Sequence, residues 1–185
     1  MNTFFLESAR LKWRKWSEDD AGLAISLWGN PEVTQYFDAR GALSDKEVLD
    51  KLAGELSTQR EFGVQYWPIF LKETGKFVGA AGLRPYDLAK GIYEKGSHLI
   101  PSCWGKGLGT EAGLKVIEHA FEQVGAKALF VGHNPKNAAS ARMIEKQAFA
   151  YTHAEFYQPT GLNHPSYLLK AAEYFEQRNN TRDTS

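Results

Sequence analysis

The sequence predicts one mixed α/β domain whose early strands pair antiparallel, and three observations support this prediction. The chain has 185 residues, of which 43% are hydrophobic, enough for a single domain with a substantial core. Apolar runs of strand length alternate with segments of helical period. Two early apolar runs flank a short turn at residues 73–76, which is typical of a hairpin. We expect the folded domain at residues 1–178 and a polar, frayed tail at residues 179–185.

The first half of the chain carries clear helix and strand signals. Ser17 and Asp20 have the spacing of a capping box at the start of a helix, which the Gly-Asn-Pro sequence at residues 29–31 ends. Before this helix, apolar and basic side chains alternate as in a short strand. The expected elements are a strand at residues 10–16, helices at 17–28 and 44–60, a hairpin at 65–86 and a strand at 92–100.

The second half continues the alternation of helices and strands. A long helix follows a glycine-rich segment, and a short apolar run of strand length comes after it. Two late strands flank a loop rich in proline, glycine and asparagine. The expected elements are helices at residues 108–123 and 137–147 and strands at 128–131, 150–156 and 167–170.

Charge and composition exclude several classes of function. Lysine plus arginine and aspartate plus glutamate each total 22, so no basic field favours nucleic acid or anionic lipid as a partner. The single cysteine, Cys103, excludes an internal disulfide framework. The chain also has no signal-peptide pattern and no apolar run of the roughly 20 residues needed to span a bilayer. We therefore expect a cytoplasmic protein with neither nucleic acid nor membrane as its partner.

The segment WGKGLGTEA, at residues 104–112, is the strongest functional signal. Each glycine costs roughly 0.5–1 kcal/mol relative to alanine where the backbone is fixed, so three in five residues indicate a special backbone shape or a close approach. A glycine loop at a helix start presents main-chain NH groups that bind phosphate oxygens. The letters fit neither a Walker loop nor a dinucleotide fingerprint, because Gly107 follows Lys106 and Thr110 stands at the last glycine position.

This segment resembles the pyrophosphate loop of the GCN5-related N-acetyltransferases (GNAT), in which Arg or Gln precedes spaced glycines. Trp104 takes the first position, as is usual in the RimJ/RimL-like ribosomal-protein branch, and Gly107 and Gly109 take the glycine positions. The resemblance extends over about residues 8–175 and includes Asn137, Ser140, Glu145, Lys146 and Phe149 downstream and residues 29–33 and 78–83 upstream. Departures occur at residues 97–98, expected to alter the acceptor pocket, and at residues 147–148, expected to alter only a helix end.

The resemblance implies a GNAT fold, with a splayed pair of parallel strands and acetyl-CoA, as co-substrate, lying between them. Leu99 and Ile100 would pair with its pantetheine. Asn134 and Asn137 could hold the pantetheine amides or cap the following helix, and we favour binding for Asn137 only. Its pyrophosphate would meet the loop, whose expected coenzyme-binding residues are Trp104, Gly105, Lys106, Gly107, Leu108, Gly109 and Thr110.

Two side chains are candidates for catalysis. Glu94 is the candidate base that takes the acceptor's proton through water, and its alternative reading is a solvated strand residue. Ser140 is the candidate hydrogen-bond donor to the coenzyme sulfur, and its alternative reading is a helical serine bonded back to a carbonyl. No metal is expected, because no histidine forms a close ligand pair with another histidine or with cysteine. Cys103 reads as a small loop residue.

The sequence thus predicts an acetyl-CoA-dependent N-acetyltransferase that transfers acetyl directly to a primary amine. The acceptor is a protein N-terminus or a small molecule, and some N-terminal aromatic side chains are expected to line its groove. Two alternatives from other classes remain: a non-catalytic acyl-CoA-binding sensor or assembly module, and a nucleotide-binding regulatory domain. The resemblance also makes a homodimer possible.

Overall fold

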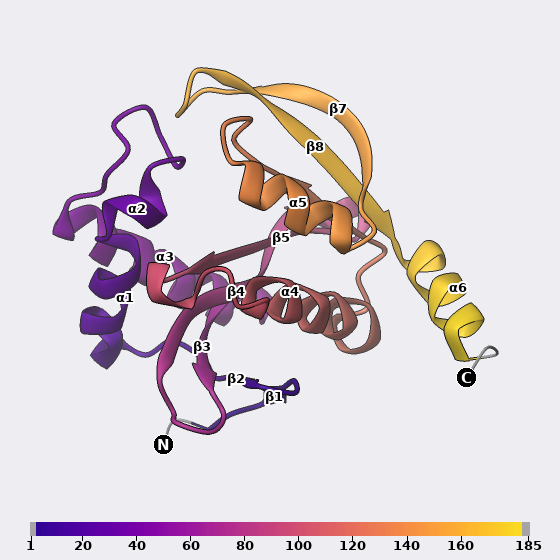
Figure 1. The fold of residues 1–185 in the computed structure, drawn as a ribbon, viewed down its shortest axis with the longest axis horizontal. Helices are drawn as coiled ribbons and strands as arrows, with labels where there is room; N and C mark the ends of the chain where they lie inside the picture. The colour runs from indigo at the N-terminus through magenta and orange to yellow at the C-terminus, as the bar shows by residue number, and fades with distance from the viewer. Residues whose placement is uncertain (1–2, 183–185) are drawn as a thin grey trace.

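The computed structural model describes residues 3–182, which form an eight-stranded sheet with helices on both faces (Figure 1). The strands are β1 (Leu6–Glu7), β2 (Leu11–Trp13), β3 (Tyr66–Leu71), β4 (Phe77–Asp87), β5 (Ile92–Leu99), β6 (Ala128–Gly132), β7 (Ala150–Tyr157) and β8 (Leu162–Lys170). The helices are α1 (Ala21–Trp28), α2 (Pro31–Thr34), α3 (Asp45–Phe62), α4 (Leu108–His119), α5 (Ala138–Lys146) and α6 (Ala171–Arg182). Shorter turns are η1 (Glu18–Asp20), η2 (Leu88–Lys90), η3 (Pro101–Cys103) and the π-helical turn η4 (Ala120–Val124).

One parallel pair interrupts an otherwise antiparallel sheet. The strand order is β1-β2-β3-β4-β5-β6-β8-β7, and only β5 and β6 run parallel in this part of the chain. Their ladder ends at the pair Glu94 and Phe130, although β5 runs on to Leu99 alongside β4. The predicted mixed fold with a splayed parallel pair is therefore confirmed.

The helices cover both faces of the sheet, and alternate residues along the strands contact different layers. Trp67 and Ala81 belong to the core cluster that includes α4, whereas Tyr66 and Ala80 belong to the cluster formed with α1 and α3. This alternation is the period of two that a strand imposes on its side chains. Among residues 3–182, no helix combines the length and hydropathy needed to cross a bilayer.

The start of the first predicted helix forms as expected, but its end differs. Asp20 accepts a hydrogen bond from the Ser17 main-chain NH (2.8 Å), as the capping box predicts. After α1, the Gly-Asn-Pro segment does more than end a helix. Asn30 caps a second, one-turn helix, α2, by accepting from the Glu32 NH (2.9 Å), and Pro31 takes its first position, where a missing NH costs nothing.

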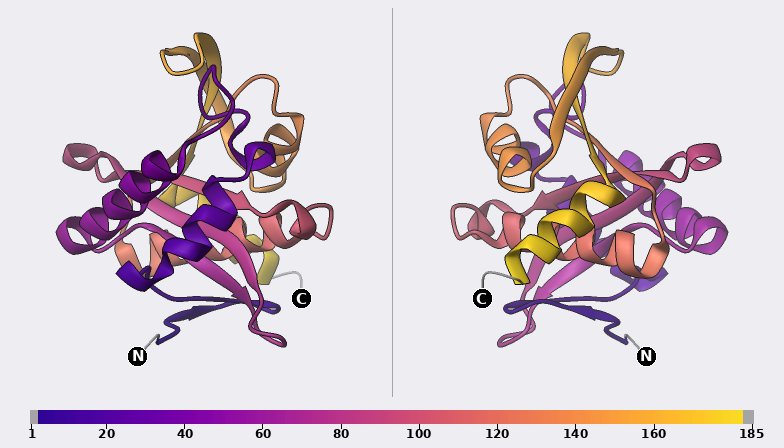
Figure 2. Two further views of the ribbon diagram at one scale, coloured as in Figure 1. Left: turned by 90° about the vertical axis from the view of Figure 1, so that its left-hand side faces the viewer. Right: turned by 90° about the vertical axis from the view of Figure 1, so that its right-hand side faces the viewer.

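The last strand is longer than predicted. β8 starts at Leu162, not at Tyr167, so only residues 158–161 separate it from β7. Pro165, in the expected loop, is compatible with the strand. The β6–β8 ladder ends at Ser166, so at Pro165 the strand β8 pairs only with β7 and has one free edge, where a proline is tolerated. The resulting hairpin rises above the rest of the molecule (Figure 2), and the Ala39 NH donates to the carbonyl of Pro159 at its tip (2.8 Å).

The end of the chain also differs from expectation. Helix α6 was not predicted, and it continues through Arg182, so residues 179–182 of the expected tail belong to this helix. Residues 183–185 of the predicted tail lie outside the described part of the chain. The mostly polar composition of α6 gives little of the apolar periodicity by which a helix is predicted.

A strained residue follows α5. Ala148 has a φ of 61°, in the left-handed region that favours glycine. We expect Ala148→Gly to raise the free energy of unfolding by about 1 kcal/mol, because it removes this strain. Chemical denaturation measures the effect.

The control for Ala148→Gly is Ala139→Gly, an exposed position in the first turn of α5. It should lower stability by a similar amount, because glycine is a weaker helix former than alanine. If Ala148→Gly is no more stable than the parent protein, the backbone at Ala148 is not strained.

Candidate functional site

The glycine loop leads from the end of β5 into α4 and adopts the predicted shape. Gly105 and Gly107 have φ values of 71° and 74°, and Gly107 is the N-cap of α4. In this described segment no side chain caps the first turn of α4. Its main-chain NH groups and the positive end of the helix dipole are therefore available to an anion, which is the geometry expected for a pyrophosphate site.

Two basic side chains donate hydrogen bonds to main-chain carbonyls in and next to the loop. The Lys106 ammonium donates to the Ser102 carbonyl (2.7 Å). Arg10 donates to the Lys106 carbonyl (3.0 Å) and pairs with Glu111 of α4 (2.6 Å). The sequence did not predict a role for Arg10 at the loop. Its guanidinium lies so close that a β carbon added to Gly107 would be 3.5 Å from it. A second cation therefore stands beside the loop.

The main chain at the end of β5 is partly engaged by the protein. The Ile100 NH donates to the Val78 carbonyl (3.0 Å), so this group is not free to pair with a ligand. The alternation of an antiparallel ladder turns the main chain of Leu99 the other way, toward the gap beside β6. Its carbonyl accepts from the Trp104 indole (2.8 Å). Pantetheine pairing by Leu99 and Ile100 stays a prediction, and the Leu99 NH is the group placed for it.

The two predicted asparagines flank the gap from the side of α5. Asn137 caps α5 by accepting from the Ser140 NH (3.0 Å). Asn134 is buried, accepts from the Lys136 NH (3.0 Å) and donates to the Tyr36 carbonyl (3.4 Å). The capping alternative is thus the one seen for Asn137, and neither residue's contact with pantetheine is tested.

Ser140 lies in the first turn of α5 and is half-buried. Within residues 3–182, its hydroxyl has no hydrogen-bond partner, unlike that of Ser26, which donates back to the Leu23 carbonyl (2.8 Å). The back-bonded alternative is therefore not what the structure contains. The hydroxyl is available to a ligand, and its proposed role at the coenzyme sulfur stays a prediction.

Glu94 lies where β5 and β6 separate, and it is not simply solvated. Its carboxylate accepts a hydrogen bond from the Tyr66 hydroxyl (2.7 Å). Burial, followed by the nearby Glu94 charge, holds the pKa of Tyr66 well above its usual value, so Tyr66 stays protonated and donates. Gly96 makes this contact possible, because a β carbon there would lie 2.2 Å from the Tyr66 hydroxyl oxygen.

His98, noted as a departure from the family pattern, lies among the aromatic rings of Trp28, Phe37 and Tyr66. Its Nδ1 accepts from the Trp28 indole (3.2 Å), and its ring packs 4.6 Å from the Phe37 ring. Burial, assisted by the charges of Lys51 and Arg84, holds the pKa of His98 well below its usual value. His98 is therefore neutral, with its proton on Nε2.

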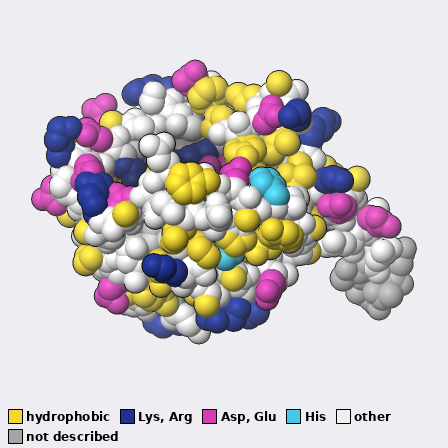
Figure 3. Space-filling model, turned by 90° about the horizontal axis from the view of Figure 1, so that it is seen from above, with side chains coloured by type: hydrophobic (Ala, Val, Ile, Leu, Met, Phe, Trp, Pro, Cys, Tyr) yellow, Lys and Arg dark blue, Asp and Glu magenta, His cyan; other side chains and the backbone are white. Residues whose placement is uncertain are grey.

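The β7–β8 hairpin extends over the top of the molecule in Figure 1. Burial, followed by the Glu94 charge, raises the pKa of Tyr157, the last residue of β7. Figure 3 views the molecule from the hairpin side and shows acidic and basic side chains set among hydrophobic ones near its middle. The site therefore has two parts, a loop with free amides and a cluster of aromatic and charged side chains around Tyr66, Glu94 and His98.

A polar pair is buried beneath the site. Lys95 of β5 donates to the Gln147 side chain (2.7 Å), and both residues are almost fully buried. Gly113 of α4 leaves the space for them, since a β carbon there would lie 1.9 Å from the Gln147 amide nitrogen. The expectation that the departures at residues 147–148 alter only a helix end is therefore wrong for Gln147, which joins α5 to β5.

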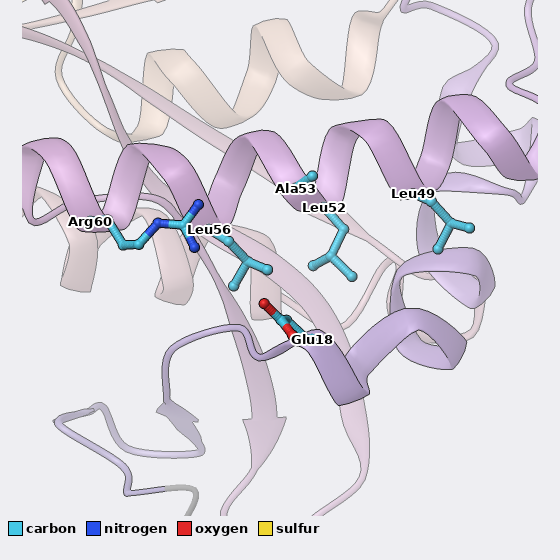
Figure 4. A pocket seen from close by; sticks show the side chains of 6 residues that line it. All are labelled: Glu18, Leu49, Leu52, Ala53, Leu56 and Arg60. Carbon is cyan, nitrogen blue, oxygen red and sulfur yellow. The ribbon is translucent and has the colours of Figure 1, made fainter.

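Other candidate features lie elsewhere. A groove of about 290 Å³ runs between α3 and η1, lined by apolar side chains of α3 with Glu18 opposite (Figure 4), and it lies apart from the glycine loop. Cys103 is free and buried. No group of three or more histidine, cysteine, aspartate or glutamate residues among those described could hold a metal ion.

Comparisons with known proteins agree with this geometry. A family model described as "Acetyltransferase (GNAT) domain" matches residues 10–150. Among curated proteins, "Uncharacterized N-acetyltransferase p20" of Bacillus licheniformis is 28% identical over 149 residues, covering 80% of this chain and 83% of that protein.

Solved structures share the fold at low identity. RimL, a ribosomal L7/L12 alpha-N-protein acetyltransferase in complex with coenzyme A, matches with a TM-score of 0.78 and 15% identity, covering 92% of this chain and 99% of that one. The spermidine N-acetyltransferase from Vibrio cholerae, in complex with coenzyme A and spermine, matches with a TM-score of 0.76 and 13% identity over 91% and 99% of the two chains.

The buried Lys95 should make stability depend on pH. Burial lowers its pKa to about 7 from 10.5, so between these values the unfolded chain binds more protons than the folded one. The free energy of unfolding therefore rises with pH in this window, by at most about 1.4 kcal/mol per unit. Lys95→Met should remove that rise, measured by denaturation at several pH values from 7 to 10. Equal slopes for Lys95→Met and the parent protein would contradict the assignment.

Proposed function

Because this chain belongs to the acetyltransferase (GNAT) family and is an N-acetyltransferase, we propose that it transfers acetyl from acetyl-CoA directly to a primary amine. The observation that carries the proposal is the glycine loop, whose uncapped amides at the start of α4 follow β5 after the short turn η3. A pyrophosphate fits there without side-chain chemistry. Bound acetyl-CoA would supply an activated thioester carbonyl at the gap between β5 and β6.

Residues of this chain have distinct tasks in the proposed reaction. Glu94 takes the proton that the attacking amine loses, through water, while the hydrogen bond from Tyr66 holds its carboxylate in place. Ser140 donates a hydrogen bond toward the departing sulfur, because its hydroxyl has no other partner among the described residues. A serine is a weak acid, so Ser140 assists the departure and does not supply the whole proton.

The acceptor is proposed to be an α-amine. An α-amino group has a pKa near 7.7–8.0, against about 10.4 for a lysine side chain, so a weak base suffices to keep a useful fraction neutral. The loop letters favour the RimJ/RimL-like branch. The fold alone does not identify the acceptor, because two solved structures with this fold are named for different acceptors, a ribosomal protein and spermidine.

A non-catalytic acyl-CoA sensor is less well supported, because Glu94 and Ser140 would then have no task. Cytoplasmic location and a homodimer are also proposals. The single buried cysteine suits a reducing compartment.

Thiol release with acetyl-CoA against a panel of free amines and peptides tests the proposed function. We expect release with at least one α-amine and stronger thermal stabilisation by coenzyme A than by ATP or NAD. Coenzyme binding without release across the panel would favour the sensor. Stronger stabilisation by ATP or NAD would favour the nucleotide-binding alternative.

Gly107→Val should weaken acetyl-CoA binding at least 100-fold, because two or more amide hydrogen bonds to a charged group are lost and each contributes about 1.5–3 kcal/mol. The side chain strains a left-handed backbone at the loop and covers its amides. The measurement is calorimetric titration. The matched control is Gly125→Val, which has the same φ of 74°, open space around it and a place at the other end of the helix. An equal loss of affinity in both variants would contradict the loop's role.

Ser140→Ala should lower kcat roughly tenfold, because one hydrogen bond to a charged group contributes about 1.5–3 kcal/mol. The dissociation constant of acetyl-CoA should change much less. Ser57→Ala, at an exposed position on α3, is the control. Steady-state kinetics and titration together separate the two effects, and an intact kcat in Ser140→Ala would show that the serine takes no part in thiol departure.

A further inference from the structure

The cluster around Tyr66, Glu94 and His98 is bordered by a lysine that has no hydrogen-bond or ion-pair partner among the described residues. Lys51 lies on α3, in the same helical stripe as the buried Val48 and Glu55, so its side chain faces inward. Its ammonium lies 4.9 Å from the centre of the Trp28 ring and 5.6 Å from that of Phe37. Within residues 3–182, Lys51 has no hydrogen bond and no ion pair.

The nearby carboxylates are already engaged. One oxygen of Glu55 pairs with Arg84, and the other accepts from the Tyr66 main-chain NH (2.8 Å). The carboxylate of Glu94 accepts from the Tyr66 hydroxyl (2.7 Å). Neither acid lies within ion-pair distance of Lys51 in the described structure. The Lys51 ammonium contacts only aromatic rings there, so it could pair with an anionic group of a ligand.

Aromatic side chains connect Lys51 to Glu94. Lys51 lies over the Trp28 and Phe37 rings, and the His98 ring packs against those of Phe37 (4.6 Å) and Tyr66 (5.6 Å), whose hydroxyl donates to Glu94. The charge of Lys51 contributes to lowering the pKa of His98, and the charges of Glu94 and Glu55 act on Lys51. Burial nevertheless outweighs these acids and lowers the pKa of Lys51 to about 8. An anion beside Lys51 would restore the charged form, since opposite charges favour each other's ionisation.

Arg84 is a second cation near these rings. It stands opposite Glu94 in the β4–β5 ladder, and its guanidinium lies 4.2 Å from the centre of the Tyr66 ring. Its side chain is about a third exposed, and it has donors beyond the one paired with Glu55. Arg84 therefore lies beside Tyr66 and Glu94, whereas Lys51 lies beside Trp28 and Phe37.

We propose that the acceptor is a small amine that carries a carboxylate a few bonds from its nitrogen, as an amino acid does. Lys51, with Arg84, binds the carboxylate, and the amine then points toward Glu94 and the gap between β5 and β6. The rings of Trp28, Phe37 and His98 hold the rest of the acceptor. This inference rests on the proposed function, because it concerns the substrate of the same site.

Pairs of acceptors test the carboxylate directly. An amino acid with a primary amine differs from its carboxamide in this charge and in the pKa of the amine, so kcat/KM per neutral amine should be at least tenfold higher for the preferred acid than for its amide. Lys51→Met should bring that ratio close to one, whereas Lys51→Arg should retain most of it. The control Lys46→Met lies on the same helix, where Lys46 pairs with Asp50 at the surface (2.6 Å), and it should leave the ratio unchanged.

A binding measurement separates this proposal from the proposed function. With coenzyme A present, thermal shift compares N-acetyl amino acids with their N-acetyl amides, which requires no turnover. We expect at least one acid to stabilise the parent protein more than its amide does, and Lys51→Met to lose this difference. If no amine is acetylated but this difference appears, the carboxylate subsite stands and the transferase proposal fails. If no acid exceeds its amide, or if Lys51→Met keeps the difference, the carboxylate subsite is wrong.

Discussion

The early end of the ladder between β5 and β6 is the constraint on which the rest of the site depends. Pairing stops at Glu94 and Phe130, while β5 continues along β4 to Leu99. Main-chain groups on the free side of β5 then need partners from outside the sheet. The same strand leads through η3 into the glycine loop, so a ligand that pairs with β5 has its anionic part at the start of α4.

Glycines make this arrangement possible at places where a side chain would prevent it. Gly107 permits the left-handed start of α4, and Gly96 admits the Tyr66 hydroxyl to Glu94. Gly113 makes room for the buried contact of Lys95 with Gln147, which joins β5 to the end of α5. The strand that carries the candidate base is therefore fixed from both of its faces.

Local signals explain what could be predicted from the sequence. The capping box at Ser17, the hairpin turn and the spacing of Gly105 and Gly107 depend on neighbouring residues, and the corresponding elements formed. The extension of β8 through Pro165 was missed because it depends on where β6 ends.

The polar interior of the site could not be predicted in the same way. Tyr66 and Glu94 are 28 residues apart, and Lys95 and Gln147 are 52 residues apart, so no local pattern joins them. Lys51 also looks like an ordinary surface lysine in the sequence. Only the packing of α3 against Trp28 and Phe37 brings it to the aromatic cluster around His98. Which charged side chains lack an ion-pair partner can be seen only in the folded structure.

A crystal structure of the protein with bound acetyl-CoA tests the central claim most directly. The account predicts that main-chain NH groups of residues 105–110 bind the pyrophosphate and that the thioester lies in the gap between β5 and β6, near Ser140. Coenzyme bound elsewhere, with this loop making no contact to phosphate, would contradict it.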